Sequence, residues 1–465
     1  MTVADRPARQ LRTTRLARNL RLARLGARVG GVYAGTAARK TFASAERRAA
    51  LDRTRELATA QQVAEELGRM KGALMKLGQM ASYLDEGLPE PLRQALSQLQ
   101  SNAPPMATEL VVATVEAELG RPIGELFVEF DPEPIAAASI GQVHRAIVID
   151  PVTGAERAVA VKVQYPGIGE AIEADLKNAD LLGTILRQSF GGLDPDEMVE
   201  EIKLRLTEEL DYRIEARNQA GFADDFRGHP FIRIPEVLPA FSTARVLTSE
   251  LVVGFGWQEL LRRPQAERDR AGEIIFRFVF RSLYTLGAFN GDPHPGNYVF
   301  HDDGTVTFLD FGLVKHFTPT EMGTFASMVK AAVVDRDAAK FRAVLESAGM
   351  LRPDAPVSTE DVGDYFSHFY NAVRDDAEMT WTSEYASSIV RHTFDRSSPI
   401  SQYATVPRAF VFIQRINLGL YALLGQLEAR GNYRRIAAEL WPFTRAEPST
   451  ALGRAEAEWL AGRAP

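Results

Sequence analysis

The segment Asp292-Pro293-His294-Pro295-Gly296-Asn297, followed further on by Asp310-Phe311-Gly312, is the most informative part of this sequence. Asp292 and Asn297 stand five positions apart in a loop that two prolines make rigid, and Asp310 comes thirteen positions after Asn297. Phosphoryl transfer from a nucleotide uses a catalytic aspartate, an asparagine and a second aspartate, the last two as ligands of Mg²⁺. The spacing of these side chains therefore predicts a nucleotide site.

A strand with a lysine precedes this loop, and a hairpin follows it. In Val159-Ala160-Val161-Lys162, alternation places the two valines on one face of a strand and Ala160 and Lys162 on the other. A lysine in that position can hold the α- and β-phosphates; the alternative is a solvated lysine at a sheet edge. Residues 298–300 and 306–309 flank Asp302-Asp303-Gly304 and predict a β-hairpin. In this order, the features are specific for kinase-like chemistry.

The hydrophobic pattern indicates strands first and helices later along the chain. Strand-like runs at 126–130, 143–149 and 158–164 predict a three-stranded antiparallel meander, and a further strand is expected at 246–253. We expect helices at 57–84, at 108–119, where Gly120 ends the helix, and from 197 to 226. This order predicts an α+β fold with a small β-containing lobe followed by a larger helical lobe.

The glycine-rich phosphate loop of ordinary kinases is replaced by alanines. The sequence Ala136-Ala137-Ala138-Ser139 stands where that loop is expected, in a connection that runs from 135 to 141. A methyl group in place of hydrogen restricts positive φ and blocks close approach of the backbone to a phosphate. We therefore expect the nucleotide to sit differently at this loop, or the loop to be less mobile.

Two expected helices carry polar side chains on faces other than their apolar face. On the helix at 57–84, Lys76 and Gln79 point together away from the apolar face. On the helix that ends at 226, Asp211, Glu215 and Asn218 share one face. This spacing predicts Glu215 as the partner of Lys162, with Glu209 as the alternative.

Positive charge is concentrated near the N-terminus. Residues 1–48 contain twelve lysines and arginines against Asp5 and Glu46, whereas the whole chain has a formal net charge of −7. A short helical pattern at 22–32, with arginines beside it, suits an anionic membrane surface; the alternative is a solvated arm. Nucleic-acid binding is not expected, because no aromatic residue lies among these arginines before Tyr33.

The composition excludes several classes of protein. The 465 residues, 45% hydrophobic and 25% charged, are typical of a globular chain of two or three domains. Cysteine is absent, which excludes disulfide scaffolds and thiolate metal sites and favours a reducing, cytoplasmic location. No uncharged apolar run of about 18 residues occurs, so no membrane span is expected. His144 and His294 have no histidine cluster nearby, and we expect them to form loop hydrogen bonds rather than bind metal.

Six motifs follow one another along the chain: Lys76-Leu77-Gly78-Gln79, Ala136 to His144, Val159 to Gly167, Glu209-Leu210-Asp211-Tyr212, Asp292 to Asn297, and Asp310-Phe311-Gly312. Together they resemble the UbiB/AarF (ADCK-like) family of atypical protein-kinase-like proteins, over about residues 60 to 440. The resemblance implies a bilobal protein-kinase-like fold with an N-terminal helical extension. It also implies binding of Mg²⁺ and ATP or ADP, kinase or ATPase activity, and a role in ubiquinone biosynthesis or lipid homeostasis, with isoprenoid lipid or quinone precursors as partners.

The resemblance also assigns roles to individual residues. Lys162 is the phosphate-binding lysine, Asp292 the catalytic-loop aspartate, and Asn297 and Asp310 the Mg²⁺ ligands. The remaining expected nucleotide-binding residues are Ala136, Ala137, Ala138, Ser139, Glu215, Glu250 and Val252. The expected regulatory residues are Lys76, Gly78 and Gln79 of the extension and, in contact with them, Glu209 and Asp211.

Two sequence features differ from those of related proteins and limit which functions are expected. Asn290-Gly291 precedes Asp292 where ordinary kinases have His-Arg, so ordinary protein phosphorylation is not expected. The C-terminal membrane spans of some bacterial members are missing, so membrane attachment is expected through the N-terminus, a helix face or partners. The alternative functions are a nucleotide-gated lipid-binding scaffold with little turnover and a small-molecule phosphotransferase.

These observations predict five parts. They are a basic N-terminal arm (1–55), a helical extension (56–120), an N-lobe with inserted helices (121–256), a C-lobe (257–440) and a C-terminal tail (441–465).

Overall fold

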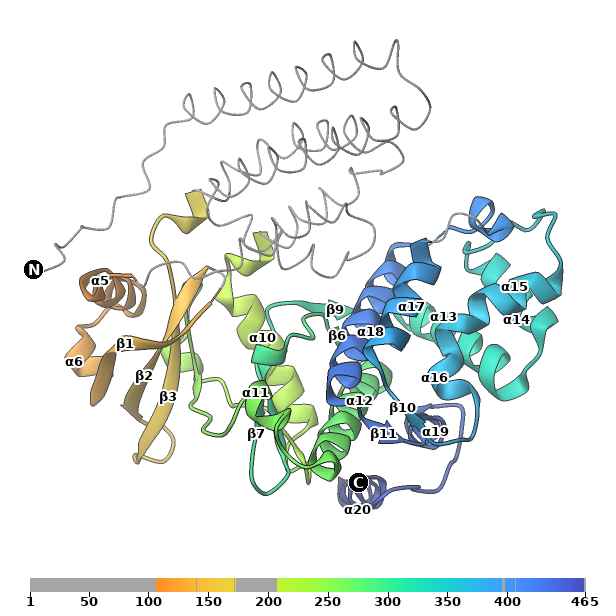
Figure 1. Cartoon of the computed structure of the whole chain (residues 1–465). Coiled ribbons are helices and arrows are strands. Elements are labelled where there is room, and N and C mark those ends of the chain that lie inside the picture. Colours follow the sequence, from red (N-terminus) through yellow and green to blue (C-terminus); the bar gives the residue numbers. More distant parts are fainter. Residues whose placement is uncertain are drawn as a thin grey trace, which may run out of the picture. The chain divides into compact units, whose positions relative to one another are not determined.

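The computed structural model describes residues 106–138, 140–170, 172, 207–394, 398–405 and 407–463. The expectations on the basic arm, on the helix at 57–84 with Lys76, Gly78 and Gln79, and on Ser139 lie outside these residues. The chain forms two compact units. Unit 1 ends at Ala216 and resumes from Val237 to Leu251, and unit 2 comprises Arg217–Glu236 and Val252–Pro465. Helix α10 (Tyr212–Asp225) begins in unit 1 and continues in unit 2 (Figure 1).

Unit 1 is built on a four-stranded antiparallel sheet. Its order is β1-β2-β3-β5, with β1 at Glu129–Ala137, β2 at Gly141–Ile149, β3 at Glu156–Gln164 and β5 at Val246–Glu250. Helix α5 (Thr108–Leu119), which α6 (Ile123–Leu126) follows, packs its Val111 and Val115 in one apolar core with Val159, Val161 and Val163 of β3. Because these valines fill one face of the sheet, Lys162 projects from the other face, as the alternation predicts.

Most sequence predictions for unit 1 are confirmed, but both ends of β1 and the end of β5 differ from the prediction. The meander is present, and α5 occupies the predicted residues and ends at Gly120, whose φ is 71°. The strand predicted at 126–130 starts late, because Leu126 still belongs to α6, and it extends through Ala136 and Ala137, which were expected in a connection. The prolines at 132 and 134 are tolerated because β1 is at the edge of the sheet. The strand predicted at 246–253 ends at Glu250.

Unit 2 is mainly helical. Its longer helices are α12 (Gln265–Leu286), α13 (Pro319–Val329), α14 (Ala338–Ser347), α15 (Thr359–Ser367), α17 (Ser383–Phe394), α18 (Arg408–Leu427), α19 (Tyr433–Leu440) and α20 (Ala451–Arg463). Short helices are α11 (Trp257–Leu260) and α16 (Asn371–Arg374). The short strands are β4 (Ile232–Arg233), β6 (Ala288–Asn290), β7 (Tyr298–Phe300), β8 (Val306–Phe308), β9 (Val314–His316), β10 (Met379–Thr380) and β11 (Arg430–Gly431).

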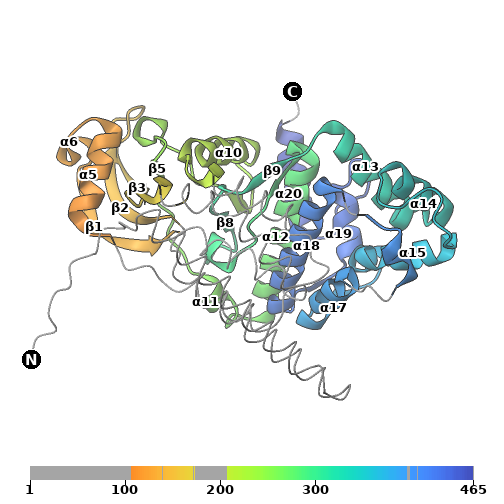
Figure 2. The ribbon, with the colours of Figure 1, turned by 90° about the horizontal axis from the view of Figure 1, so that it is seen from above.

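Helix α12 runs through the core of unit 2. Its Ile274, Ile275 and Phe278 are at most 2% exposed, and α18 lies beside it in both views (Figures 1 and 2). Strands β7 and β8 form the predicted hairpin. None of the helices in the described ranges has both the length and the apolar composition to cross a bilayer.

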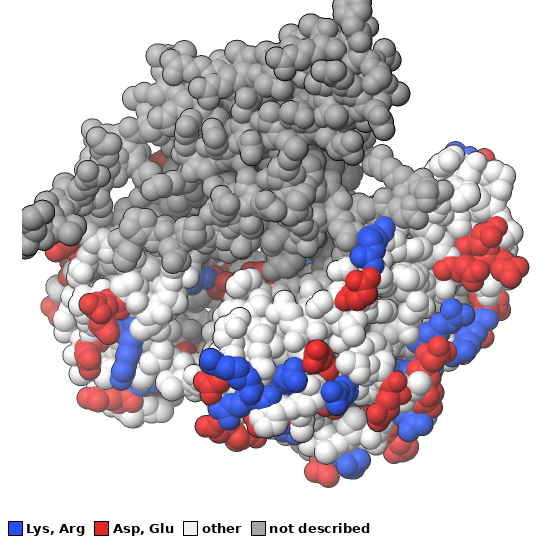
Figure 3. All heavy atoms as spheres, viewed as in Figure 1, with Lys and Arg blue, Asp and Glu red and all other residues white. Residues whose placement is uncertain are grey.

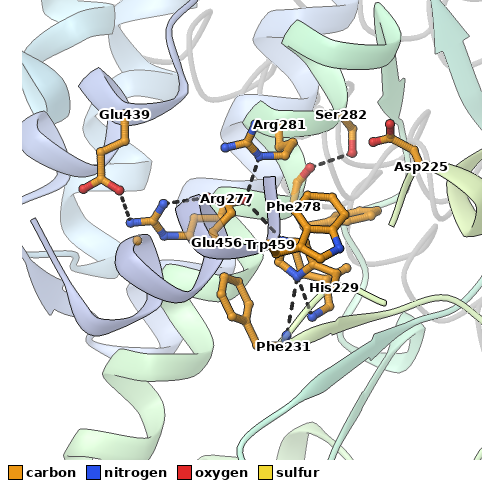
Figure 4. Close-up of polar contacts among 12 residues, drawn as sticks. Asp225, His229, Phe231, Arg277, Phe278, Arg281, Ser282, Glu439, Glu456 and Trp459 are labelled. Atoms are coloured by element: carbon orange, nitrogen blue, oxygen red, sulfur yellow. Dashed lines mark hydrogen bonds and ion pairs between the residues drawn. The ribbon is translucent and has the colours of Figure 1, made fainter. Parts of the chain in front are cut away.

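A buried ionic cluster attaches α20 to α12 (Figure 4). Arg277 is fully buried and donates to Glu273 at 2.8 Å, to Glu439 at 2.7 Å and to Glu456 at 2.8 Å. Arg281 donates to the other oxygen of Glu456 at 2.7 Å. The segment 441–465, which the sequence analysis separates as a tail, thus contributes a helix whose Glu456 is 2% exposed. On the face seen in Figure 3, by contrast, the acidic and basic side chains of the described residues are exposed and interspersed.

The cluster predicts a pH dependence of stability. Desolvation would raise the pKa of Glu456, but the His229 hydrogen bond and the Arg281 and Arg277 guanidinium groups outweigh it and lower the pKa to about 2. Because the folded-state pKa lies below the unfolded value, the stabilisation is complete above about pH 4.5 and is lost as the pH falls toward 2. We expect Glu456→Gln to lower the free energy of unfolding by about 3 kcal/mol at pH 7. The difference from wild type should shrink in urea titrations below pH 4.5, and a difference independent of pH would contradict the assignment.

Candidate functional site

The Asp292 to Asn297 loop is held by hydrogen bonds within itself. Its Pro295–Asn297 segment forms a 3₁₀ turn that His294 caps, because His294 Nδ1 accepts from Gly296 N at 3.1 Å. Asn297 Nδ2 donates to the Asp292 carbonyl at 3.0 Å, and the Asn297 carbonyl accepts from Leu309 N at 2.8 Å. Since the amide nitrogen of Asn297 is turned to the loop, Oδ1 is the atom that this residue can offer to a metal. The expectation that His294 forms a loop hydrogen bond is confirmed. His144 lies in β2 instead of a loop, and its Nδ1 is 2.8 Å from the Asp131 carbonyl of β1.

Asp310 has an uncommon backbone conformation. Its φ is 60°, in the left-handed region. Arg336 and Glu428, the other two non-glycine residues with positive φ in the described ranges, end helices, whereas Asp310 lies in a loop. Asn290 Nδ2 donates to the Asp310 carbonyl at 3.1 Å, and Asp310 Oδ1 accepts from Gly312 N at 3.1 Å. Such a conformation persists where the surroundings fix it, and it is concentrated at functional sites.

Asn290 is a residue that sequence reasoning treated only as a departure. Besides holding Asp310, its Oδ1 accepts from Asp292 N at 3.3 Å. One amide side chain thus connects the backbone at the two aspartates of the candidate site. The sequence feature that could have indicated this role is the position of Asn290, two residues before Asp292.

Phe311 is fixed by α10. It is fully buried, and its ring centroid lies 4.9 Å from that of Phe222. Asn218 Nδ2, one turn earlier on α10, donates to the Phe311 carbonyl at 3.0 Å. The packing of this phenylalanine distinguishes active from inactive arrangements in kinases, and here α10 holds it inside.

The first turn of α10 supplies the partner of Lys162. Lys162 Nζ donates to Glu215 Oε1 at 2.8 Å and to Oε2 at 2.9 Å, and it lies 5.1 Å from the centre of the Tyr212 ring. The two side chains are 17% and 8% exposed, so the pair is largely removed from water. The prediction that Glu215 rather than Glu209 is the partner of Lys162 is confirmed by this contact. In protein kinases, a strand lysine paired with a helix glutamate is one of the conditions of an active site.

Asp211 does not belong to the helical face predicted for it. The helix expected from 197 to 226 is interrupted at Leu210 and Asp211, and α10 begins at Tyr212. Asp211 Oδ1 accepts from Arg213 N at 3.0 Å, and both its carboxylate oxygens bind the Arg213 guanidinium at 2.8 Å. An aspartate in this position satisfies a free N–H of the first helical turn, which is why the helix starts after it. The expected contacts of Glu209 and Asp211 with the extension lie outside the described residues.

The alanine segment ends a strand. Ala136 pairs with Val143 and Ala137 with Gln142, and Ala138 N donates to the Gly141 carbonyl at 2.9 Å. Unlike a free phosphate loop, this segment has part of its backbone committed to the sheet. Glu250, at the end of β5, pairs with Arg157 at 3.5 Å, and Val252 is the first residue of unit 2 after that strand. Nucleotide contacts of these residues remain predictions.

Carboxylate and amide oxygens suit a hard cation such as Mg²⁺. Asp310 and Asn297 provide one of each, and their backbones are joined through Leu309, whose N–H binds the Asn297 carbonyl. Among the residues that the structure describes, no group of three or more histidine, cysteine, aspartate or glutamate side chains is arranged as a metal centre. In nucleotide sites, Mg²⁺ is bound by one or two protein ligands together with phosphate oxygens.

The fold and these contacts define a kinase-like protein, and comparisons identify the family. The sequence model of the ABC1 atypical kinase-like domain matches residues 98–345, so the chain belongs to this family, which is the UbiB/ADCK family. The predicted kinase-like fold is confirmed by a solved structure, the complex of Rv3197 with erythromycin from Mycobacterium tuberculosis. That structure is 30% identical, with a TM-score of 0.61, and the alignment covers 83% of this chain and 96% of the other.

Curated relatives are similar over part of their length. Protein ACTIVITY OF BC1 COMPLEX KINASE 7, chloroplastic, of Arabidopsis thaliana is 34% identical over 66% of this chain and 44% of the relative. Atypical kinase COQ8B, mitochondrial, of Rattus norvegicus is 32% identical over 60% of this chain and 53% of the relative. The chain spans about half the length of the curated relatives that it matches.

The Lys162–Glu215 pair predicts a non-additive pair of substitutions. Lys162→Met removes the ammonium from a carboxylate that is 8% exposed, and we expect a loss of about 3 kcal/mol in the free energy of unfolding. Lys162→Met combined with Glu215→Leu removes both charges, and it should be more stable than Lys162→Met alone. Urea unfolding of the two single variants and the double variant measures the coupling. Additive losses would contradict a pair that depends on mutual compensation.

Proposed function

We propose that this chain binds a Mg²⁺–adenine nucleotide and acts as an ATP-dependent atypical kinase or ATPase of the UbiB type. The observation that carries this proposal is Asp310, held in the left-handed conformation by Asn290 and Gly312 while α10 buries the adjoining Phe311. Family membership and the kinase names of its relatives support the same activity.

Each polar residue has a distinct role in the proposed reaction. Lys162 neutralises phosphate charge, and Glu215 keeps its ammonium in place. Asp310 and Asn297 supply oxygen ligands to Mg²⁺, which neutralises charge on the phosphates when it is bound. Asp292 orients the attacking group and accepts its proton. The alanines of β1 replace glycines that would approach the phosphates closely, which favours a slow or selective nucleotide cycle over rapid protein phosphorylation.

The proposed biological role is support of isoprenoid quinone biosynthesis or lipid homeostasis at an anionic membrane surface. COQ8B, named an atypical mitochondrial kinase, supports the quinone assignment, and the basic residues at 1–48 support the membrane surface. A scaffold with little turnover is the alternative if nucleotide binds without hydrolysis. A small-molecule phosphotransferase is the second candidate, favoured by the erythromycin complex of the solved relative. ADP formation and phosphate release are both measured alone, with anionic liposomes, with quinone precursors and with a macrolide. An ATPase forms the two products in equal amounts, a phosphotransferase forms ADP in excess of free phosphate, and a scaffold forms neither.

We expect Asp310→Asn to abolish Mg²⁺-dependent binding of ADP. A neutral amide replaces poorly the carboxylate that a hard dication requires. The Asn side chain retains an oxygen for Gly312 N, so the local fold should survive. Thermal unfolding with Mg²⁺–ADP, with ADP and EDTA, and without nucleotide provides the measurement. Stabilisation by Mg²⁺–ADP equal to that of wild type would refute the metal assignment.

A further inference from the structure

Helix α20 holds the C-terminal end of α10. The last carbonyl groups of a helix lack partners within the helix and are stabilised by a nearby cation. Arg463 of α20 donates to two of these carbonyls, that of Asp225 and, at 3.3 Å, that of Asp224. Trp459 Nε1, one turn earlier on α20, donates to the Arg227 carbonyl at 3.2 Å, just beyond the end of α10. Two side chains of α20 thus cap α10.

The cap is attached to the core of unit 2 from its other side. Glu456, one turn before Trp459, is held by Arg277 and Arg281 of α12, and its Oε1 lies 3.3 Å from His229 Nε2 (Figure 4). The His229 ring packs edge-on against Trp459, with ring centroids 4.5 Å apart. Because α20 is anchored to α12, the contacts that α20 makes with α10 can restrict the movement of α10.

The same helix carries the residues that hold Phe311. Phe222 and Asn218 contact Phe311, and Phe226, one turn after Phe222, packs on Phe278 of α12 at 5.4 Å. Phe222 also contacts Phe278, at 5.8 Å. These aromatic contacts form a continuous path from the capped end of α10 to Phe311 and so to Asp310.

We propose that Trp459 and Arg463 are positioning residues for the nucleotide site, acting through α10 on Phe311 and Asp310. The expected effect of these residues on nucleotide affinity rests on the proposed function. Their expected effect on Phe311 does not. Removal of either cap lets the end of α10 move, and Asn218 and Phe222 then hold Phe311 less firmly. The C-terminal helix thereby sets the affinity for Mg²⁺–nucleotide without touching it.

The test compares Trp459→Phe and Arg463→Met with matched changes on the same helix. Trp459→Phe keeps an aromatic ring and removes the N–H donor, and Arg463→Met keeps the apolar stem and removes the charge. The controls are Leu460→Ala, at an exposed side chain beside Trp459, and Arg454→Met, at an exposed arginine earlier on α20. Hydrogen exchange of apo protein is measured at 218–226 and 311–313, and the Kd for Mg²⁺–ADP is measured by calorimetry on the full chain.

We expect faster exchange in both segments and a Kd raised about fivefold or more for the two cap variants, with no change for the controls. A purely structural role is excluded with Phe341→Leu, a change in the separate apolar core formed by α14 and α15 that lowers the Tm. That variant should leave exchange at 311–313 and the Kd unchanged. Faster exchange at 218–226 without change at 311–313 would overturn the proposal. If wild type binds no Mg²⁺–ADP, the proposed function fails, and the exchange data still decide the coupling.

Discussion

The ion pair of Lys162 and Glu215 is the interaction that fixes the start of α10 against β3 in unit 1. A lysine on a strand and a carboxylate on a helix are both largely out of water, and each is tolerated because the other is present. The pair requires α10 to begin close to β3, and Asp211 produces that start by binding the N–H of Arg213. Within unit 2, Asn218 and Phe222 of α10 contact Phe311, and the adjoining Asp310 has a left-handed conformation.

Two sequence features distinguish this chain from ordinary kinases. Asn290 replaces a residue of the usual His-Arg-Asp sequence and joins the catalytic loop to Asp310 through one amide side chain. Alanines in a paired strand replace the glycines of a mobile loop. Each change restricts the backbone locally, in β1 and in the Asp292 loop, and we propose slow, regulated chemistry partly on this ground.

The local features of this fold were predictable from sequence. Period-two alternation predicted β2 and β3, and Gly120 predicted the end of α5. The spacing of Asp211, Glu215 and Asn218 predicted Glu215 as the partner of Lys162, although Asp211 lies before α10 begins. Errors arose where tertiary contacts override local preference. The alanine-rich segment predicts a connection from 135 to 141, yet β1 continues to Ala137. Asp211 interrupts the helix that was expected from 197 to 226 and caps α10. The part played by α20 could not be predicted, because Glu456 resembles a solvated helix residue until Arg277 and Arg281 are placed beside it.

The central claim is that Asp310 and Asn297 hold the metal of a bound adenine nucleotide. A crystal structure of the full chain with ADP and Mn²⁺, which gives an anomalous signal where Mg²⁺ does not, tests it most directly. The account predicts one anomalous peak within coordination distance of the Asp310 carboxylate and Asn297 Oδ1, with phosphate oxygens completing the shell. Bound nucleotide whose metal lies on other side chains, or ADP bound with neither residue in contact with metal, would contradict it.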